Sequence, residues 1–375
     1  MKKLMLIALL LLLPAFIIAQ DAKPADRHVF TKVYDLKATP VKNQGGTGTC
    51  WSFATTSFLE SELLRMGKGE FDLSEIFFAR NAYVSKTEQL IRLGGKNNFG
   101  QGGQAHDVID VIREKGIMPE EAYSGILPGE MGHNHGELEN AVSSLAQGIA
   151  KKPGRNLTPR WRNAVDGVID AFIGKAPEKF TYKGKEYTAK SFAKELGLNP
   201  DDYIELTSFA NFPFNTKVHL SVPDNWSHAQ YYNVSIDDLM KIMEYALKNG
   251  YTVDWDGDVS EKEFNKGNAN YSVVPADSKD TDTSKPEKEK TITDAMRLES
   301  FDKFQTTDDH LMHITGMATN QEGTKFWLTK NSWGPVGKYG GYWYMSDAYA
   351  RYKVVAILVH KNAIPNDIKS NLGIK

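Results

Sequence analysis

The order of the patterns along the chain predicts an α+β protein of two lobes, with helices first and strands last. Apolar residues recur at helical spacing over 51–66, from 74 to 83 and before 115. The last quarter instead contains short β-rich runs separated by Gly, Asn, Pro and Asp. Because the two kinds of element are segregated, we expect a helical lobe, a β-rich lobe and a cleft between them.

The first 19 residues have the pattern of a secretory signal. Lys2 and Lys3 precede an apolar run that ends on the small residue Ala19. The run is short for a transmembrane helix, and Pro14 interrupts it, although an uncleaved anchor is the competing interpretation. We therefore expect a signal peptide over 1–19, export to a periplasm or the medium, and no stable membrane anchor.

The remaining chain divides into segments that differ in composition and pattern. We expect a short lead-in at 20–40, a helical lobe at 41–122, a helical insertion at 123–230, a β-rich lobe at 231–361 and a polar tail at 362–375. Within them the patterns predict helices that open at Thr158–Pro159 and span 191–196 and 235–249. Predicted strands span 313–319, 325–330, 341–345 and 353–360, and 276–291 reads as an exposed loop.

Charge excludes some classes of partner. The chain has 45 basic and 47 acidic residues, and no basic tract that could neutralise phosphates. We therefore expect no nucleic-acid partner.

The chain has one cysteine, Cys50, so an internal disulfide is impossible. It follows the glycine-rich turn Gly45-Gly46-Thr47-Gly48 and opens a helical pattern, where the helix dipole favours a thiolate. A lone cysteine is more often a buried, inert thiol, and composition alone favours that reading. The turn before it favours a nucleophile instead.

Residues far from Cys50 in sequence supply the other groups that a thiol enzyme needs. A histidine lies in the run 310–314, which contains both His310 and His313, and would serve as ion-pair partner and acid. Asn331 would orient the histidine ring, and Trp333 would cover their bond. The side-chain amide of Gln44 would join the Cys50 backbone N–H in an oxyanion hole.

These motif pieces together resemble the papain-like cysteine peptidases. They are Gln44, the run Cys50-Trp51-Ser52-Phe53-Ala54, His313, and the run Asn331-Ser332-Trp333-Gly334, in the family's order. The runs at 102–104, 232–234, 259–260 and 308–313 narrow the resemblance to the bleomycin hydrolase (aminopeptidase C) branch. The resemblance covers 41 to about 358.

The resemblance implies a papain-like two-lobe fold and selects His313 as the catalytic histidine, with His310 structural. It also implies that the backbone of Gly102 and Gly103 binds substrate, although these glycines could simply shape a turn. The branch has an inward-folded C-terminal arm that goes with aminopeptidase action and a hexameric ring. The tail at 362–375 could play that part, so a homo-oligomer is possible.

Two further runs contain residues that could ligate a metal ion, but neither fits the pattern of a metal site. The run 133–137 (His-Asn-His-Gly-Glu) has no second ligand cluster, and we expect a solvated loop. The run 254–258 (Asp-Trp-Asp-Gly-Asp) has its glycine two positions too early for a calcium loop, and we expect an acidic turn. No metal or other cofactor is expected.

The sequence therefore predicts an exported cysteine peptidase that cleaves peptides or proteins through a Cys50 thioester, with aminopeptidase action as first choice. Endopeptidase action is the alternative. A non-catalytic peptide-binding or scaffold protein of the same fold, and a cysteine hydrolase or acyltransferase acting on non-peptide amides, stay open.

Overall fold

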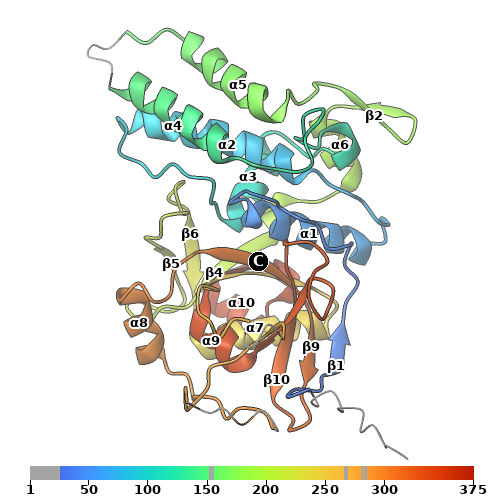
Figure 1. Ribbon diagram of the computed structural model, residues 1–375, viewed down its shortest axis with the longest axis vertical. Helices are drawn as coiled ribbons and strands as arrows, with labels where there is room; N and C mark the ends of the chain where they lie inside the picture. Colours follow the sequence, from blue (N-terminus) through green and yellow to red (C-terminus); the bar gives the residue numbers. More distant parts are fainter. Residues whose placement is uncertain (1–25, 152–155, 266–268, 280–281, 283–284) are drawn as a thin grey trace, which may run out of the picture.

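The computed structural model describes residues 26–151, 156–265, 269–279, 282 and 285–375. The predicted signal peptide at 1–19 lies outside the described residues. Figure 1 shows a helical lobe stacked on a lobe built around a sheet. Across the ranges that are described, no helix is both long enough and apolar enough to cross a bilayer.

The first three helices are those predicted from sequence. They are α1 (Cys50–Arg65), α2 (Glu75–Arg92) and α3 (Ala105–Glu114). Ser74 caps α2, because its Oγ accepts a hydrogen bond from the N–H of Phe77 at 3.0 Å. Nearly every residue of α1 is buried, which makes it the central helix of the molecule.

The insertion adds a second helical layer over α2 (Figure 1). It comprises η1 (Glu120–Ala122), α4 (Gly136–Ala150), α5 (Arg160–Ile173), the hairpin of β2 (Phe180–Tyr182) and β3 (Lys185–Tyr187), α6 (Ala189–Leu196) and η2 (Pro200–Asp202). Helix α4 begins inside the predicted solvated loop at 133–137. That prediction is wrong, because His135 is buried and its Nδ1 lies 2.9 Å from the hydroxyl of Tyr83.

The last part of the predicted insertion belongs to the main sheet. Its strands are β4 (Tyr203–Thr207), β5 (Thr216–His219) and, at the expected boundary, β6 (Gln230–Asn233). The strands follow the order β5-β6-β4-β12-β7-β9-β10-β11-β8, and β1 also pairs with β9. The strands not yet bounded are β1 (Thr31–Asp35), β7 (Val253–Gly257), β8 (Tyr271–Ser272), β9 (His310–Thr319), β10 (Lys325–Lys330), β11 (Tyr342–Ser346) and β12 (Val354–His360).

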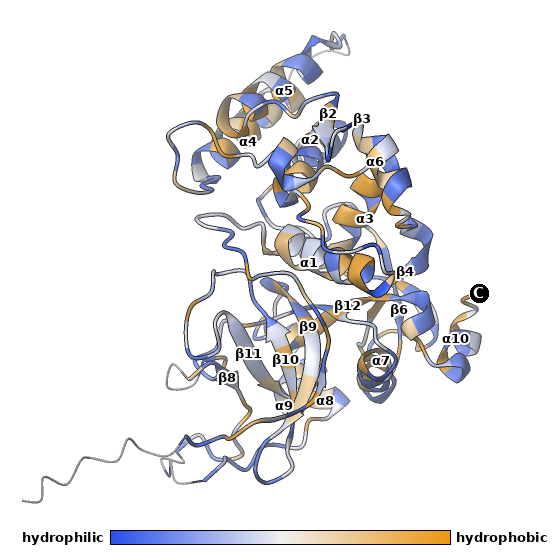
Figure 2. Ribbon diagram, turned by 90° about the vertical axis from the view of Figure 1, so that its right-hand side faces the viewer, coloured by the Kyte–Doolittle hydropathy of each residue, from blue (hydrophilic) through white to orange (hydrophobic). Residues whose placement is uncertain are grey.

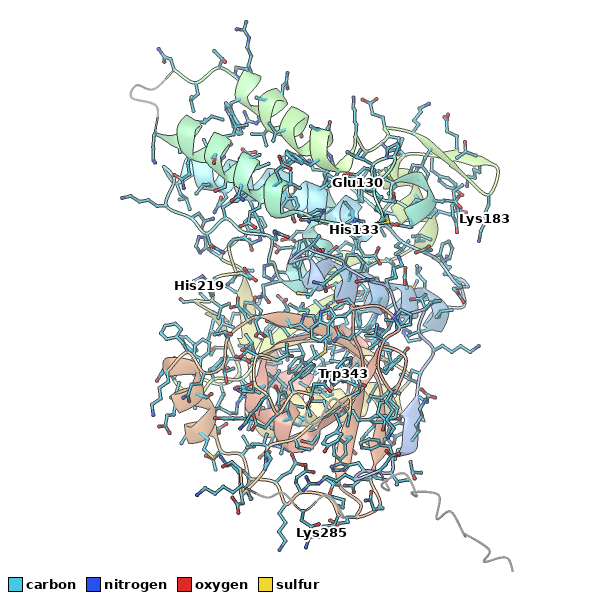
Figure 3. The ribbon with its side chains drawn as sticks, in the orientation of Figure 1. Glu130, His133, Lys183, His219, Lys285 and Trp343 are labelled. Atoms are coloured by element: carbon cyan, nitrogen blue, oxygen red, sulfur yellow. The ribbon has the colours of Figure 1, made fainter. Side chains whose placement is uncertain are left out.

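Among the described residues, the sheet lobe also contains α7 (Ile236–Lys248), α8 (Asp294–Asp302), α9 (Asp347–Lys353), the short 3-10 helix η4 (Lys361–Ala363) and α10 (Asn366–Leu372). Trp343 lies in the interior of this lobe, whereas Lys183 and Lys285 lie at the periphery of the molecule (Figure 3).

The C-terminal tail packs against α7. Ile368 and Leu372 of α10 are buried in the core cluster that α7 shares with the sheet. Asp367 also pairs with Lys241 of α7 at 2.7 Å. The end of the chain lies beyond α10 at the edge of the molecule (Figure 2).

Helix α1 crosses the sheet lobe over β7 and β9. The hydroxyl of Thr55 on α1 donates to Asp254 Oδ2 at 2.6 Å, and Phe58 shares a core cluster with Leu311 of β9. The predicted acidic turn at 254–258 is wrong, because 253–257 form β7, which is buried along its whole length. Its pairing with β12 and β9 satisfies the backbone, and this outweighs the turn preference of Asp and Gly.

Candidate active site

Cys50 is the first residue of α1 and is 7% exposed. The turn before it is fixed from two directions. The N–H of Gly46 donates to the carbonyl of His133 at 2.8 Å, and the N–H of Gln44 donates to the carbonyl of Ser332 at 2.8 Å. Gly45 has φ +65°, and a Cβ there would lie 2.6 Å from the His133 carbonyl oxygen, so only glycine fits.

The side chain of Gln44 is held in the same turn. Its Oε1 accepts from the hydroxyl of Ser332 at 2.6 Å, and its Nε2 donates to the carbonyl of Thr47 at 2.7 Å. One of the two Nε2 protons is thereby used, and the other stays free for an oxyanion. The structure brings Gln44 to the Cys50 turn and fixes its orientation.

Asn331 pairs with His310. The Oδ1 of Asn331 lies 2.8 Å from His310 Nε2, and the Trp333 ring lies over the imidazole with centroids 4.8 Å apart and planes at 30°. Trp333 is 37% exposed, whereas His310 is buried, so the indole shields the bond from water. A ring Nε2–H that donates to Asn331 leaves Nδ1 as the basic nitrogen.

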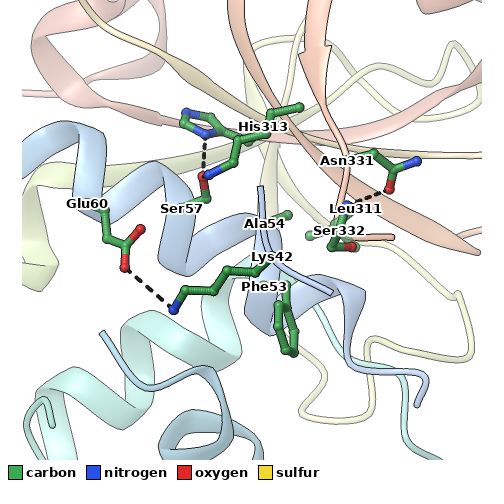
Figure 4. Close-up of a pocket in the computed structure, with 10 residues that line it drawn as sticks. Lys42, Phe53, Ala54, Ser57, Glu60, Leu311, His313, Asn331 and Ser332 are labelled. Carbon is green, nitrogen blue, oxygen red and sulfur yellow. Dashed lines mark hydrogen bonds and ion pairs between the residues drawn. The ribbon is translucent and has the colours of Figure 1, made fainter. Parts of the chain in front are cut away.

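His313 lies elsewhere, and the expectation that Asn331 orients it is wrong. Its Nδ1 lies 2.9 Å from the hydroxyl of Ser57 on α1, as Figure 4 shows. The two histidines are three positions apart on β9, and side chains an odd number of positions apart point to opposite faces of a strand. Lys330 is paired in register with His313 and also contacts Ser57, while the next residue, Asn331, faces His310.

The glycine turn at 102–103 lies beside the Cys50 turn. The Nε1 of Trp51 donates to the carbonyl of Gln101 at 3.0 Å, and the side chain of Gln101 accepts from the N–H of Gly48 at 2.8 Å. A Cβ on Gly103 would lie 2.9 Å from the Trp51 ring. The structure thus brings Gly102 and Gly103, the predicted substrate-binding edge, to the nucleophile.

The comparisons with known proteins give the family. The Peptidase C1-like family model matches residues 163–374, more than half of the chain, and the model of the papain family of cysteine proteases matches 29–152. The chain belongs to the Peptidase C1-like family.

Relatives of known name match over most of the chain. Bleomycin hydrolase of Mus musculus is 26% identical over 399 residues, covering 91% of this chain and 84% of the relative. Aminopeptidase C of Listeria monocytogenes is 23% identical, covering 89% and 83%. The predicted branch of the C1 peptidases is confirmed by these full-length relatives.

A solved structure confirms the predicted α+β papain-like fold. PepW of Lactobacillus rhamnosis superposes with a TM-score of 0.70 at 19% identity, covering 92% of this chain and 84% of that one.

Burial dominates the electrostatics of this C1-family site. It raises the pKa of the Cys50 thiol to about 12, although backbone hydrogen bonds of Leu311 and Trp51 lower it. The negative charges of Asp224 and Asp256 raise it further. Burial also lowers the pKa of His310 to about 4, although the hydrogen bond that its ring donates to Asn331 raises it. The structure thus favours a neutral thiol and imidazole, whereas the helix position alone predicts a thiolate.

Three acidic residues at the site were missed in the sequence. Asp308 lies two positions before His310, inside the run 308–313 that narrows the resemblance, but that run gave no indication of its role. Asp256 lies on β7, which reads as a turn, and Asp224 lies in the loop between β5 and β6, far from every motif. In the part of the chain that is described, no group of three or more His, Cys, Asp or Glu could hold a metal ion.

Proposed function

We propose that this C1-family protein is a cysteine aminopeptidase in which Cys50 is the nucleophile and His310, in place of His313, is the acid and base. The pairing of His310 with Asn331 under Trp333 carries this proposal. The next residue after His310, Leu311, forms a backbone hydrogen bond with the Cys50 sulfur, which supports a position of His310 near the thiol. The full-length relatives named as aminopeptidases support the choice of reaction.

The chemistry follows from these positions. The Nδ1 of His310 accepts the thiol proton as the sulfur of Cys50 attacks the carbonyl carbon of the substrate. The backbone N–H of Cys50 and the free Nε2 proton of Gln44 stabilise the negative oxygen. His310 then gives its proton to the leaving amine, which leaves a thioester on Cys50. Water, deprotonated by His310, hydrolyses the thioester and restores the thiol.

The two alternatives of the same fold make different predictions. An endopeptidase would cleave internal bonds of N-acetylated peptides, and a scaffold protein would bind peptides without turnover. The family match and the relatives named as aminopeptidases favour a peptidase over a cysteine hydrolase or acyltransferase acting on non-peptide amides.

The deciding experiment compares the purified protein with its Cys50→Ala variant on an unblocked peptide and on its N-acetylated form. We expect release of the first residue from the unblocked peptide, loss of this activity in Cys50→Ala, and little cleavage of the blocked peptide. Unchanged hydrolysis by Cys50→Ala would remove the nucleophile assignment, and equal cleavage of both peptides would favour the endopeptidase.

We also propose that the protein is exported, because 1–19 has the three regions of a signal peptide. Sequencing the N-terminus of the protein isolated from its native host tests this. A mature chain beginning near Gln20 is expected, and an intact Met1 on a cytoplasmic protein would contradict it.

A further inference from the structure

Asp224 lies against the glycine turn beside the nucleophile. A Cβ on Gly102 would lie 1.9 Å from Asp224 Oδ2 and 2.5 Å from Oδ1, so the carboxylate occupies the space that a side chain at 102 would need. The loop that carries Asp224 is pinned, because its backbone N–H donates to Asp308 Oδ2 at 2.9 Å. The indole N–H of the nearby Trp226 also donates to Asp107 Oδ2 at 2.9 Å.

Asp256 lies behind this carboxylate without a partner. It is 3% exposed, and neither of its carboxylate oxygens has a hydrogen-bond partner among the described residues. On β7 it is paired in register with Leu311, which meets the Cys50 sulfur, so Asp256 faces the first turn of α1. A buried carboxylate without a partner is costly, so burial and the charges of Asp308 and Asp224 raise the pKa of Asp256 well above its usual range, and a cation placed nearby would favour its charged form.

Asp224, Asp256 and Asp308 form one acidic cluster. Burial is the largest cause that raises the pKa of these carboxyls, and two members of the cluster add to it: Asp308 and Asp224 raise the pKa of Asp256, and Asp224 raises that of Asp308. No salt bridge among the described residues includes any of the three. The cation that faces Asp224 is Lys86, and its ammonium is fixed to the backbone carbonyls of Gly100 and Gly102. The cluster therefore has room for a further positive charge.

The position of the acidic cluster relative to Cys50 indicates which positively charged group it would bind. His310 must reach the leaving amine, so the leaving part of the substrate lies toward His310 and Trp333. The cluster lies on the Gly102 side of Cys50, where the acyl part of the substrate would lie. In an unblocked peptide the α-amino group is separated from the attacked carbonyl carbon by a single carbon atom, so it comes to lie here.

We propose that Asp224, backed by Asp256 and Asp308, receives the protonated α-amino group of the first residue of the substrate. This inference rests on the aminopeptidase function proposed above and names the residues that enforce it. A lysine or arginine side chain carries the same kind of cation, but the contact of Asp224 with the Gly102 backbone places the carboxylate next to the substrate main chain.

The main test measures kcat/KM for three substrates: an unblocked alanyl amide, its N-acetyl form, and an N-acetyl-lysyl amide. The variant is Asp224→Asn, which keeps the shape of the side chain, and the matched control is Asp201→Asn, whose side chain is 79% exposed. We expect the preference for the unblocked over the acetylated alanyl amide to fall about tenfold to a hundredfold in Asp224→Asn, and to stay unchanged in the control. An unchanged preference in Asp224→Asn would overturn the proposal. Efficient cleavage of the N-acetyl-lysyl amide would instead assign the cluster to a side chain.

A second pair of variants tests the same position through the backbone. Gly102→Ala places a methyl group on the Asp224 carboxylate and should reduce the same preference by displacing it. The matched control is Gly100→Ala, where a Cβ would come no nearer than 3.8 Å to Glu139, so its preference should match the wild type. A Gly102→Ala protein that keeps the full preference would contradict the proposed contact.

Binding to a Cys50→Ala background separates this proposal from the proposed function, because it needs no turnover. Equilibrium dialysis should show that Cys50→Ala binds the unblocked peptide more tightly than the acetylated one, and that adding Asp224→Asn removes the difference. If Cys50→Ala still hydrolyses peptides, the assignment of Cys50 as the nucleophile is wrong. The affinities are then measured with a non-hydrolysable peptide analogue, and they still decide the role of Asp224. Equal affinities in the Cys50→Ala protein would overturn the proposal.

Discussion

Each end of the interface between α1 and β9 contains a histidine, but the two histidines have different partners. At one end His310 pairs with Asn331, its neighbour Leu311 hydrogen-bonds the Cys50 sulfur, and the acidic cluster has no salt bridge among the described residues. At the other end His313 contacts Ser57, whose hydroxyl also accepts from Lys330 at 2.7 Å. Figure 4 shows the ion pair of Lys42 and Glu60 near this second end. Because both residues are histidines, the groups that each one contacts distinguish the reactive end from the structural end.

The largest expected contrast is between the two histidines. His310→Ala should lower kcat by about 10²- to 10⁴-fold, because it removes the base and acid. His313→Ala should leave kcat of the folded protein within a few-fold of wild type and should instead lower the free energy of unfolding by about 1–3 kcal/mol. Steady-state kinetics and denaturant unfolding of both variants measure this. A large loss of kcat in a stable His313→Ala protein would reverse the assignment.

The acidic end should also respond to pH through its charge. Burial is the main cause that raises the pKa of Asp224 to about 6 and of Asp308 to about 7. Protonation as the pH falls through this range removes the negative charge that attracts an ammonium group. Above a pH of about 8 a peptide amino group loses its own proton. The preference for unblocked substrates should therefore peak between about pH 7 and 8 and fall up to tenfold per unit on the acidic side.

Of the other charged groups that face the cluster, Asp309 titrates in the same range, because burial raises its pKa to about 7, and its charge raises the pKa of Asp308. Lys86 is fixed to backbone carbonyls, and Glu205 is engaged by His106 Nδ1 at 2.7 Å. Asp107 and Glu139 raise the pKa of Asp224 further. Kinetics from pH 5 to 9 on both alanyl amides measure the window, and Asp224→Asn should flatten its acidic limb. A preference that does not change with pH would contradict the role of the carboxylates.

Asn331→Ala should have a smaller effect at the reactive end. One neutral hydrogen bond contributes about 0.5–1.5 kcal/mol, and about 1.4 kcal/mol corresponds to a tenfold change in rate. We therefore expect kcat to fall about tenfold with little change in KM, since Asn331 holds His310 and does not touch the acyl part of the substrate. A rise in KM at constant kcat would show that Asn331 binds substrate instead.

The smallest expected effect concerns the His313 end of the interface and the stability of the protein. Burial raises the pKa of Asp254 to about 8, above its value in the unfolded chain. The folded state therefore binds more protons between about pH 4 and 8, and the stability that Asp254 contributes is lost as the pH rises through this range. Asp254→Asn stays neutral and should gain stability over wild type by up to about 1.4 kcal/mol for each pH unit between pH 5 and pH 8. Urea unfolding at the two values measures it, and equal differences would contradict the raised pKa.

Local patterns predicted much of the architecture and part of the site. The three first helices, strand β10 and the fold class agree with the sequence, because apolar spacing and the cap at Ser74 act over a few residues. Cys50, Gln44 and Asn331 were found through their neighbours in sequence, and the structure brings them together.

The predictions that failed concern residues that are far apart in sequence and meet only in the fold. The choice between His310 and His313 needed the register of β9 against β10, which a one-residue shift inverts. Asp256 was misread because β7 has the composition of a turn and is held as a strand by its two neighbours. Asp224 reaches the site from another loop through tertiary packing alone.

The nearness of Asp224 and Asp256 to the thiol has a consequence for the reactivity of the sulfur. Burial is the largest cause that raises the pKa of the Cys50 thiol, and the charges of the two carboxylates add to it, so both oppose formation of the thiolate. In the proposed mechanism, an ammonium group docked at Asp224 would remove the part of this opposition that comes from charge and would favour transfer of the thiol proton to His310. The N-terminus of an unblocked substrate would then help to activate the nucleophile, and a blocked peptide would not.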